Sequence, residues 1–107
     1  MAAEPKAQKE RLREKVMAVL RECYDPELRL NIVDLGLIYG VEVDRSTVKI
    51  TMTLTSPACP LYPQMRAEIE QKVMQIPGVK DIEIELVFDP PWSIDKASED
   101  VRALMGL

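Results

Sequence analysis

The 107-residue sequence contains no histidine. Without an imidazole, the chain cannot form a Ser-His or Cys-His catalytic pair, nor any metal site that uses a histidine ligand. It has four glycines and no Gly-x-x-x-x-Gly-Lys phosphate loop, which argues against nucleotide hydrolysis by this chain alone. Thiols, hydroxyls, carboxylates and cations are the groups left to carry its chemistry.

Cysteines and long apolar runs are also scarce. Cys23 and Cys59 are too few for a disulfide scaffold, so both are expected to be free thiols in a reducing cytosol, although a bridge between them stays open. No apolar run approaches the ~20 residues of a membrane span, and the N-terminus lacks the apolar stretch of a secretory signal. We therefore expect a cytoplasmic protein with no membrane association.

The formal net charge of −4 is unevenly distributed. Residues 1–21 carry six basic and three acidic groups, whereas the remainder carries eight basic and fifteen acidic groups. Such an acidic body lacks the clustered Lys/Arg face of a nucleic-acid binder, so no nucleic-acid partner is expected. The charges near the N-terminus alternate in sign and are interpreted as a solvated helix face.

Apolar residues recur at helical spacing in two stretches. The first predicted helix spans residues 5–23 and ends before Asp25-Pro26, because proline disfavours helical angles in the residue before it. The second has its apolar stripe from Leu61 to Ile76 and stops at Pro77-Gly78, and a short third helix capped by Ser98 runs through Leu104. Cys23 lies on the apolar stripe of the first helix and is interpreted as a small buried residue.

Apolar and polar residues alternate in three further stretches, 37–44, 47–55 and 81–88, which predict strands. In the first stretch, Leu37, Tyr39, Val41 and Val43 are predicted to share the apolar face. The first two strands form a hairpin, and the helix between the second and third makes that pair parallel.

These elements predict an α/β (α+β) two-layer sandwich. A small mixed sheet of three main strands carries amphipathic helices on one face, in the order α-β-β-α-β-α. Residues 1–107 are expected to form a single domain, with residues 1–8 flexible. The order of the strands in the sheet stays open.

The stretch from Thr53 to Met65 has the richest chemistry. Cys59 sits between two prolines, after a strand and just ahead of a helix whose positive dipole end favours a thiolate. Thr53 and Thr55, on the polar face of the incoming strand, can donate hydroxyl hydrogen bonds to a thiolate or a ligand. Cys59 is interpreted as a reactive thiol or a metal ligand, the alternative being a loop cysteine without a role.

One cysteine is too few to hold an iron-sulfur cluster or a structural zinc. Further ligands would come from a second copy across a two-fold axis, from a partner protein, or from the carboxylates of Asp25, Glu27 and Asp34. Asp25 and Glu27 flank Pro26, and the residues alone favour turn chemistry and helix capping over a ligand role for them.

Two other positions carry structural expectations. Asp34 is expected to bond nearby backbone amides, and Gly36 to supply a positive φ angle. Trp92, in the stiff Asp89-Pro90-Pro91-Trp92 loop, either packs against the domain or anchors a partner.

Several of these motifs resemble a known family. They are Asp25-Pro26-Glu27, Asn31-Ile32-Val33-Asp34-Leu35-Gly36-Leu37-Ile38-Tyr39, Thr51-Met52-Thr53-Leu54-Thr55-Ser56-Pro57-Ala58-Cys59-Pro60, Ile76-Pro77-Gly78-Val79 and Asp89-Pro90-Pro91-Trp92. The series resembles the metal-sulfur cluster biosynthetic domain family, which includes SufT-like and PaaD-like proteins, over roughly residues 12–107.

The resemblance implies an iron-sulfur cluster assembly domain-like fold and a role in maturing iron-sulfur proteins. It equates the family's reactive cysteine with Cys59 and its acidic motif with Asp25 and Glu27; Asp34, Thr53 and Thr55 match other recurrent positions. The similar NifU-type carriers have a Cys-x-x-Cys pair where this chain has Cys59-Pro60-Leu61-Tyr62. Neither the Cys-rich C-terminal region of PaaD-like members nor a P-loop ATPase domain is expected, which favours a standalone SufT-like factor.

Three functions follow as hypotheses. In the first, a non-enzymatic factor passes iron or iron-sulfur clusters, held transiently at Cys59 if at all, to client apo-proteins together with cluster-assembly proteins. In the second, the chain is a metal-free adaptor in a multi-protein complex such as a phenylacetate-type oxygenase system. In the third, Cys59 is the nucleophile of a thiol enzyme, although no histidine base or resolving cysteine is present. A homodimer is compatible with each.

Overall fold

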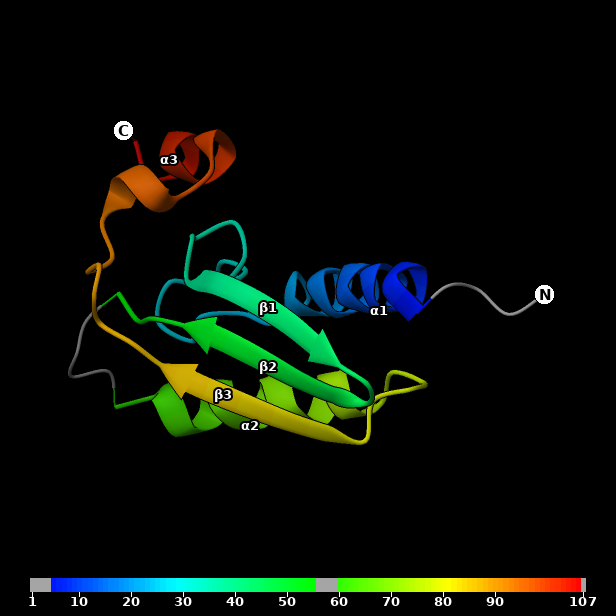
Figure 1. The fold of residues 1–107 in the computed structure, drawn as a ribbon. Coiled ribbons are helices and arrows are strands. Elements are labelled where there is room, and N and C mark those ends of the chain that lie inside the picture. Colours follow the sequence, from blue (N-terminus) through cyan, green and yellow to red (C-terminus); the bar gives the residue numbers. More distant parts are fainter. Residues whose placement is uncertain (1–4, 56–59, 107) are drawn as a thin grey trace.

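The structure is a computed structural model that describes residues 5–55 and 60–106. The elements follow one another as helices and strands in the expected order. They are α1 (Pro5–Leu20), β1 (Ile38–Asp44), β2 (Thr47–Met52), α2 (Tyr62–Met74), β3 (Asp81–Leu86), a 3-10 turn (Ile94–Lys96) and α3 (Glu99–Leu104). Figure 1 shows α1 and α2 behind one face of the three-stranded sheet, with α3 beyond the start of β1.

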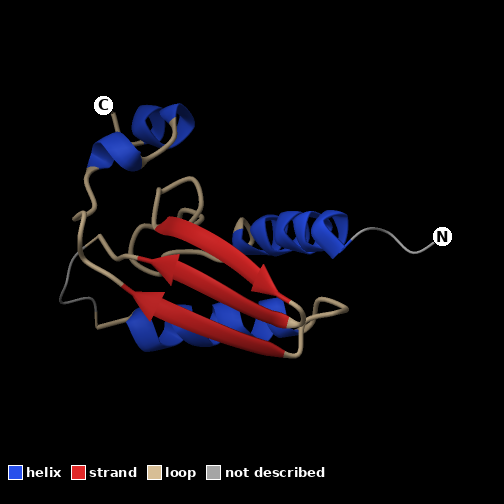
Figure 2. Cartoon of the chain, viewed as in Figure 1, coloured by secondary structure: helices blue, strands red, loops and turns tan. Residues whose placement is uncertain are grey.

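The strands are ordered β1-β2-β3, which the sequence left open. β1 and β2 form an antiparallel hairpin that closes at Asp44 opposite Thr47, and β2 and β3 are parallel from Thr47–Asp81 to Met52–Leu86. Figure 2 shows β2 and β3 with their arrowheads at the same end and β1 reversed. The predicted mixed sheet is confirmed.

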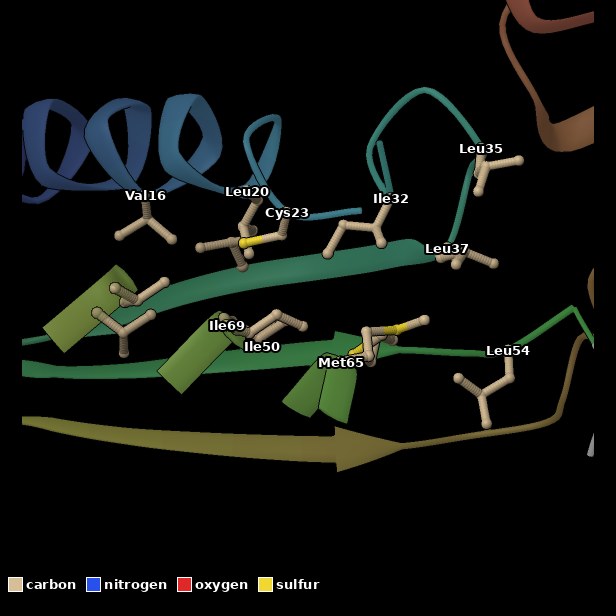
Figure 3. Packing of buried hydrophobic residues seen from close by; sticks show 14 of the residues in the cluster. Val16, Leu20, Cys23, Ile32, Leu35, Leu37, Ile50, Leu54, Met65 and Ile69 are labelled. Atoms are coloured by element: carbon tan, nitrogen blue, oxygen red, sulfur yellow. The ribbon is translucent and has the colours of Figure 1, made fainter. Parts of the chain in front are cut away.

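One apolar cluster fills the space between the sheet and the two long helices. Val16 and Leu20 of α1, Ile50 of β2, and Met65 and Ile69 of α2 are almost or wholly inaccessible to solvent. Figure 3 shows these side chains meeting between the layers. Each such side chain contributes about 1.5–3 kcal/mol through burial, so this layer fixes the position of both helices against the sheet.

The predicted face of β1 is wrong at Tyr39. A bulge between Ile38 and Gly40 interrupts the pairing, so that Ile38 lies opposite the buried Met52 and takes the place expected for Tyr39. The hydroxyl of Tyr39 instead donates to the carbonyl oxygen of Pro90 at 2.8 Å. One extra residue in the strand is enough to move a side chain to the other face.

The first helix ends three residues earlier than predicted. The amides of Glu22 and Cys23 bond three residues back, to Val19 and Leu20, which tightens the last turn, and the carbonyl of Cys23 accepts from Ile32. The expected flexibility of residues 1–8 stays a prediction, because α1 includes residues 5–8 and residues 1–4 lie outside the described part of the chain.

The segment after β3 returns to the loop that precedes β1. The Ser98 amide donates to the Asp34 carbonyl at 2.8 Å, and the Ser98 hydroxyl caps α3 by accepting from the Val101 amide. Gly36 has the expected positive φ, +79°, and a Cβ there would collide with the carbonyl group of Lys96. Glycine is therefore required at position 36 for space as well as for conformation. Within the described residues, no helix has both the length and the apolar character needed to cross a membrane.

Candidate functional site

The sequence places the candidate site where β2 ends and the chain crosses to α2. Cys59 itself lies outside the described residues, as do the three residues before it. Thr55 is the last described residue on the strand side, and Pro60 is the first on the helix side. Thr55 and Pro60 therefore bound the described parts of this crossing.

Thr53 lies at the strand side of the crossing and is fully buried. Its amide donates to the Leu37 carbonyl at 2.8 Å, which extends the β1–β2 pairing beyond the hairpin. Its hydroxyl oxygen, Oγ1, has no hydrogen-bond partner among the described residues. A buried hydroxyl without a partner costs about 1–3 kcal/mol, so this group is unusual in a small folded chain. Thr55, two residues on, is half-buried.

The helix side of the crossing is the N-terminus of α2. Leu61 occupies the cap position without a side-chain hydrogen bond, a proline stands in the first two helical positions, and the first turn has no acidic residue. The first helical bond described at this end runs from the Met65 amide to the Leu61 carbonyl. The positive end of the helix dipole is thus uncompensated by side chains of its own first turn.

Asp25 builds a tight turn rather than an open acidic site. Its Oδ1 accepts from the amides of Glu27 and Leu28, at 2.8 and 2.9 Å, and its side chain is buried. The backbone of Asp25 also bonds both ways, to the carbonyl of Leu30 and from the amide of Arg29, whose φ is +58°. The turn interpretation of the acidic motif accounts for the bonds of Asp25 Oδ1, and a ligand role for Asp25 stays a prediction.

The other two carboxylates of the prediction have different roles. Glu27 contributes its backbone amide to the Asp25 turn while its side chain is exposed. Asp34 Oδ2 accepts from the side-chain amide of Asn31 at 2.8 Å, and the Asp34 amide donates to Asn31 Oδ1. The expected capping of backbone amides by Asp34 is thus carried out by Asn31. Among the described residues, no three Asp, Glu or Cys side chains form a metal-binding group, so these carboxylates do not make a site by themselves.

Trp92 is tied to its own chain. Its indole nitrogen donates to the Leu35 carbonyl at 2.6 Å, and the half-buried ring packs against the core. Close by, the ammonium group of Lys96 lies 5.3 Å from the centre of the Tyr39 ring, whose hydroxyl bonds to Pro90. These contacts support the packing interpretation of Trp92; contact with a partner stays a prediction.

Cys23 is a free thiol with no solvent exposure. Burial raises its pKa to about 11, the nearby carboxylates of Glu68 and Glu22 add to the shift, and Lys72 opposes it. The thiol is protonated at neutral pH and makes one weak bond, to the Val19 carbonyl at 3.6 Å. Its predicted role as a core residue is confirmed.

Two features of this end of the molecule were not anticipated from the sequence. The orphan hydroxyl of Thr53 was expected on a polar strand face, but alternation alone cannot reveal that the face is covered there. The bond from Trp92 to Leu35 joins residues far apart in the chain, and a tryptophan in a proline-rich loop gave only a general signal of packing.

Comparison with known families and proteins gives consistent matches. The family model described as "Iron-sulfur cluster assembly protein" matches residues 13–86. The Bacillus subtilis (strain 168) protein named Fe-S protein maturation auxiliary factor YitW is 42% identical over 99 residues, covering 92% of this chain and 97% of its own. The Staphylococcus aureus (strain USA300) protein named Fe-S protein maturation auxiliary factor SufT is 40% identical over 84 residues, covering 78% of this chain and 96% of its own.

A solved structure extends this similarity to the fold. The crystal structure of a domain of unknown function, DUF59, from Bacillus anthracis superposes with a TM-score of 0.90 at 35% identity. It covers 95% of this chain and 98% of its own. The arrangement of sheet and helices described above is therefore shared with an experimentally determined relative.

Proposed function

Because the chain belongs to the iron-sulfur cluster assembly protein family, we propose that it is a maturation factor that assembles iron-sulfur clusters or transfers them to client apo-proteins. It works through Cys59, as a carrier or assembly partner rather than as an enzyme. The cluster, or iron alone, is its cargo and is held only in passing.

The observation that carries this proposal concerns the other cysteine. The sequence has two thiols, and Cys23 is enclosed in the core with a pKa raised to about 11. Iron and sulfide chemistry requires a thiolate that can be reached. Any cysteine chemistry of this chain therefore falls to Cys59.

The surroundings of the crossing between β2 and α2 suit an anionic group. The N-terminus of α2 has no acidic residue in its first turn to offset its dipole, which favours a thiolate or a negatively charged cluster nearby. The unpartnered hydroxyl of Thr53 is a donor on the strand side of the same crossing. Both features support an assignment of Cys59 as the functional thiol.

A single thiolate does not complete the coordination of a cluster. The described part of the chain supplies no group of three metal-binding side chains, so the missing ligands come from elsewhere. We propose that the client, or a second copy of the chain in a homodimer, provides them. Incomplete coordination by the carrier favours release of the cargo to a client with a full ligand set.

We place this activity in the cytoplasm, whose reducing conditions keep thiols available for metal ligation. Anaerobic incubation with ferrous iron and sulfide, followed by absorbance spectroscopy and iron analysis, tests the proposal. The wild type and Cys23→Ala are expected to take up iron and develop sulfide-to-iron charge-transfer bands, whereas Cys59→Ser does not. Uptake by Cys59→Ser equal to that of the wild type would overturn the role of Cys59. A wild type that never takes up iron would leave the metal-free adaptor as the better account.

A further inference from the structure

A second feature lies at the opposite end of the sheet from the crossing between β2 and α2. There, the first half of α1, the β1–β2 turn and the α2–β3 turn come together, as Figure 1 shows. They enclose a groove of about 550 Å³ whose charged lining residues are Lys9, Arg11, Lys15 and Arg45. We call this the basic groove.

All the charged side chains of the basic groove have the same sign. No carboxylate is among the described residues that line it, although acidic residues outnumber basic ones, 18 to 14, in the whole chain. Three of the four cations come from the basic stretch 1–21, and Arg45 adds a fourth from the acidic remainder of the chain.

α1 brings cations but no carboxylate to the basic groove. Arg11 and Lys15 are four residues apart and line the basic groove, whereas Glu10 and Glu14, also four residues apart, do not. Like charges at this spacing destabilise an isolated helix by about 0.2–0.5 kcal/mol per pair, and alternating signs would avoid the cost. The predicted solvated helix face is consistent with the exposure of these residues, and the side of it that lines the basic groove carries cations only.

The β1–β2 turn separates charge in the same way. Arg45 lines the basic groove, while its neighbour Asp44 lines a hollow on the other side of the sheet together with Glu42 and Glu83. Arg45 has a φ of +58°, so the turn itself directs the two neighbours apart. Two independent elements thus deliver cations to one place.

The floor of the basic groove is apolar. Leu12 of α1 and Val43 of β1 are half-buried beneath the cations, and Pro77 closes one side. The volume falls within the range of about 300–1,000 Å³ that is usual for small-molecule sites. Arginine forks and lysine ammonium groups are the side chains that bind phosphate oxygens best.

We propose that the basic groove binds a polyphosphate group, held by Lys9, Arg11, Lys15 and Arg45. The ligand is bound and not hydrolysed, since the chain lacks a phosphate loop. Free polyphosphate and the phosphate tail of a nucleotide share this chemistry, and the apolar floor gives a nucleotide an additional surface. None of the residues that line the basic groove belongs to the crossing between β2 and α2, so failure of this proposal would leave the proposed function untouched.

Calorimetric titration of the full chain with inorganic tripolyphosphate tests the proposal. It is carried out at about 0.1 M salt, where the Debye length of about 10 Å screens distant charges. The groove variant Lys15→Gln/Arg45→Gln removes two cations that line the hollow. The matched control, Arg21→Gln/Arg66→Gln, removes two exposed cations elsewhere and causes the same change in net charge.

The wild type is expected to bind saturably, and the groove variant to lose about tenfold or more in affinity, the effect of removing two charge-assisted contacts. The affinity of the control for tripolyphosphate is expected to change by less than about twofold, because the charges it loses are distant and screened.

ATP titrated in parallel distinguishes free polyphosphate from a nucleotide as the ligand. Equal affinity for ATP and tripolyphosphate indicates recognition of phosphate alone, and tighter binding of ATP indicates contact with the apolar floor of the groove. No saturable binding, equal losses in both variants, or tighter binding of an acidic peptide than of tripolyphosphate would overturn the proposal. Unchanged circular dichroism of both variants excludes unfolding as the cause.

Discussion

The indole nitrogen of Trp92 and the carbonyl oxygen of Leu35 are joined by a hydrogen bond of 2.6 Å. This contact holds the loop after β3 against the loop before β1, next to the end of the sheet where Thr53 is buried. It links the C-terminal segment to the frame of the candidate site.

Trp92→Phe removes this bond while keeping an aromatic ring. It is expected to lower the free energy of unfolding by about 1 kcal/mol, the net value of a partly buried hydrogen bond, and Trp92→Ala by about 3 kcal/mol or more through lost packing. Urea denaturation followed by circular dichroism measures both. If both substitutions lowered the free energy of unfolding only slightly and by the same amount, the Trp92 ring would not pack against its own chain and would be available to contact a partner.

Gly36→Ala is expected to be strongly destabilising. A side chain at a φ of +79° costs about 1–3 kcal/mol, and the new Cβ would also collide with the Lys96 carbonyl group. Gly78→Ala is the matched control, because Gly78 also has a positive φ but open space around it. Thermal and urea unfolding should show a larger loss for position 36. Equal losses would mean that the C-terminal segment does not pack as described.

Asp25→Ala is expected to lower the free energy of unfolding by about 2–3 kcal/mol, since it leaves the amides of Glu27 and Leu28 without their acceptor. Asp25→Asn keeps an oxygen acceptor and should recover most of the loss. The exposed Glu27→Gln should change stability by less than about 0.5 kcal/mol.

Iron uptake separates the turn from a ligand role in the same variants. If Asp25 only stabilises its turn, Asp25→Asn should fold and take up iron as the wild type does. Normal stability combined with lost iron uptake in Asp25→Asn would instead make Asp25 a ligand.

Thr53→Val replaces the orphan hydroxyl by a methyl group of similar shape. Because Oγ1 has no partner among the described residues, we expect a gain in stability of about 1 kcal/mol, accompanied by slower iron uptake if the hydroxyl serves the site. Thr53→Ser keeps the hydroxyl and is the control for uptake. A loss of stability in Thr53→Val would reveal a hydrogen bond that the hydroxyl makes in the folded protein.

Cys23 gives the protein a pH dependence in the alkaline range. Its pKa is raised to about 11 in the folded state, above the roughly 8.5 of an unfolded thiol, so the folded state holds the proton more tightly. The contribution of the protonated Cys23 thiol to the free energy of unfolding is fully present below about pH 8.5, and it is lost as the pH rises through about 11. The stability of the wild type relative to Cys23→Ala, measured by urea unfolding at several pH values, should fall over this range. A constant difference would mean that the thiol is not buried.

The sequence was sufficient for features that depend on local periodicity. Alternation of Val48, Ile50 and Met52 identified a strand with one buried face, and Ser98 identified the cap of α3. Gly36 was expected to have a positive φ because few other residues adopt one. Each inference relied on neighbours in the chain.

Features that depend on contacts between distant parts of the chain could not be predicted from local periodicity. The bulge that moves Tyr39 off the apolar face is fixed by pairing with β2, and the separation of Arg45 from Asp44 is fixed by the hairpin turn. The burial of Thr53 was likewise not predictable, because alternation places this residue on the polar face of its strand. For the candidate site, residue types were predictable, but Asp25 and Asp34 proved to bond within their own loops.

The central claim is that Cys59 carries the cargo and Cys23 does not. Transfer of iron and sulfide from the anaerobically loaded protein to an apo-ferredoxin, followed by circular dichroism of the ferredoxin cluster, tests it most directly. The account predicts transfer from the wild type and from Cys23→Ala, and no transfer above the rate with free iron and sulfide from Cys59→Ser. Transfer from Cys59→Ser at the wild-type rate would contradict it.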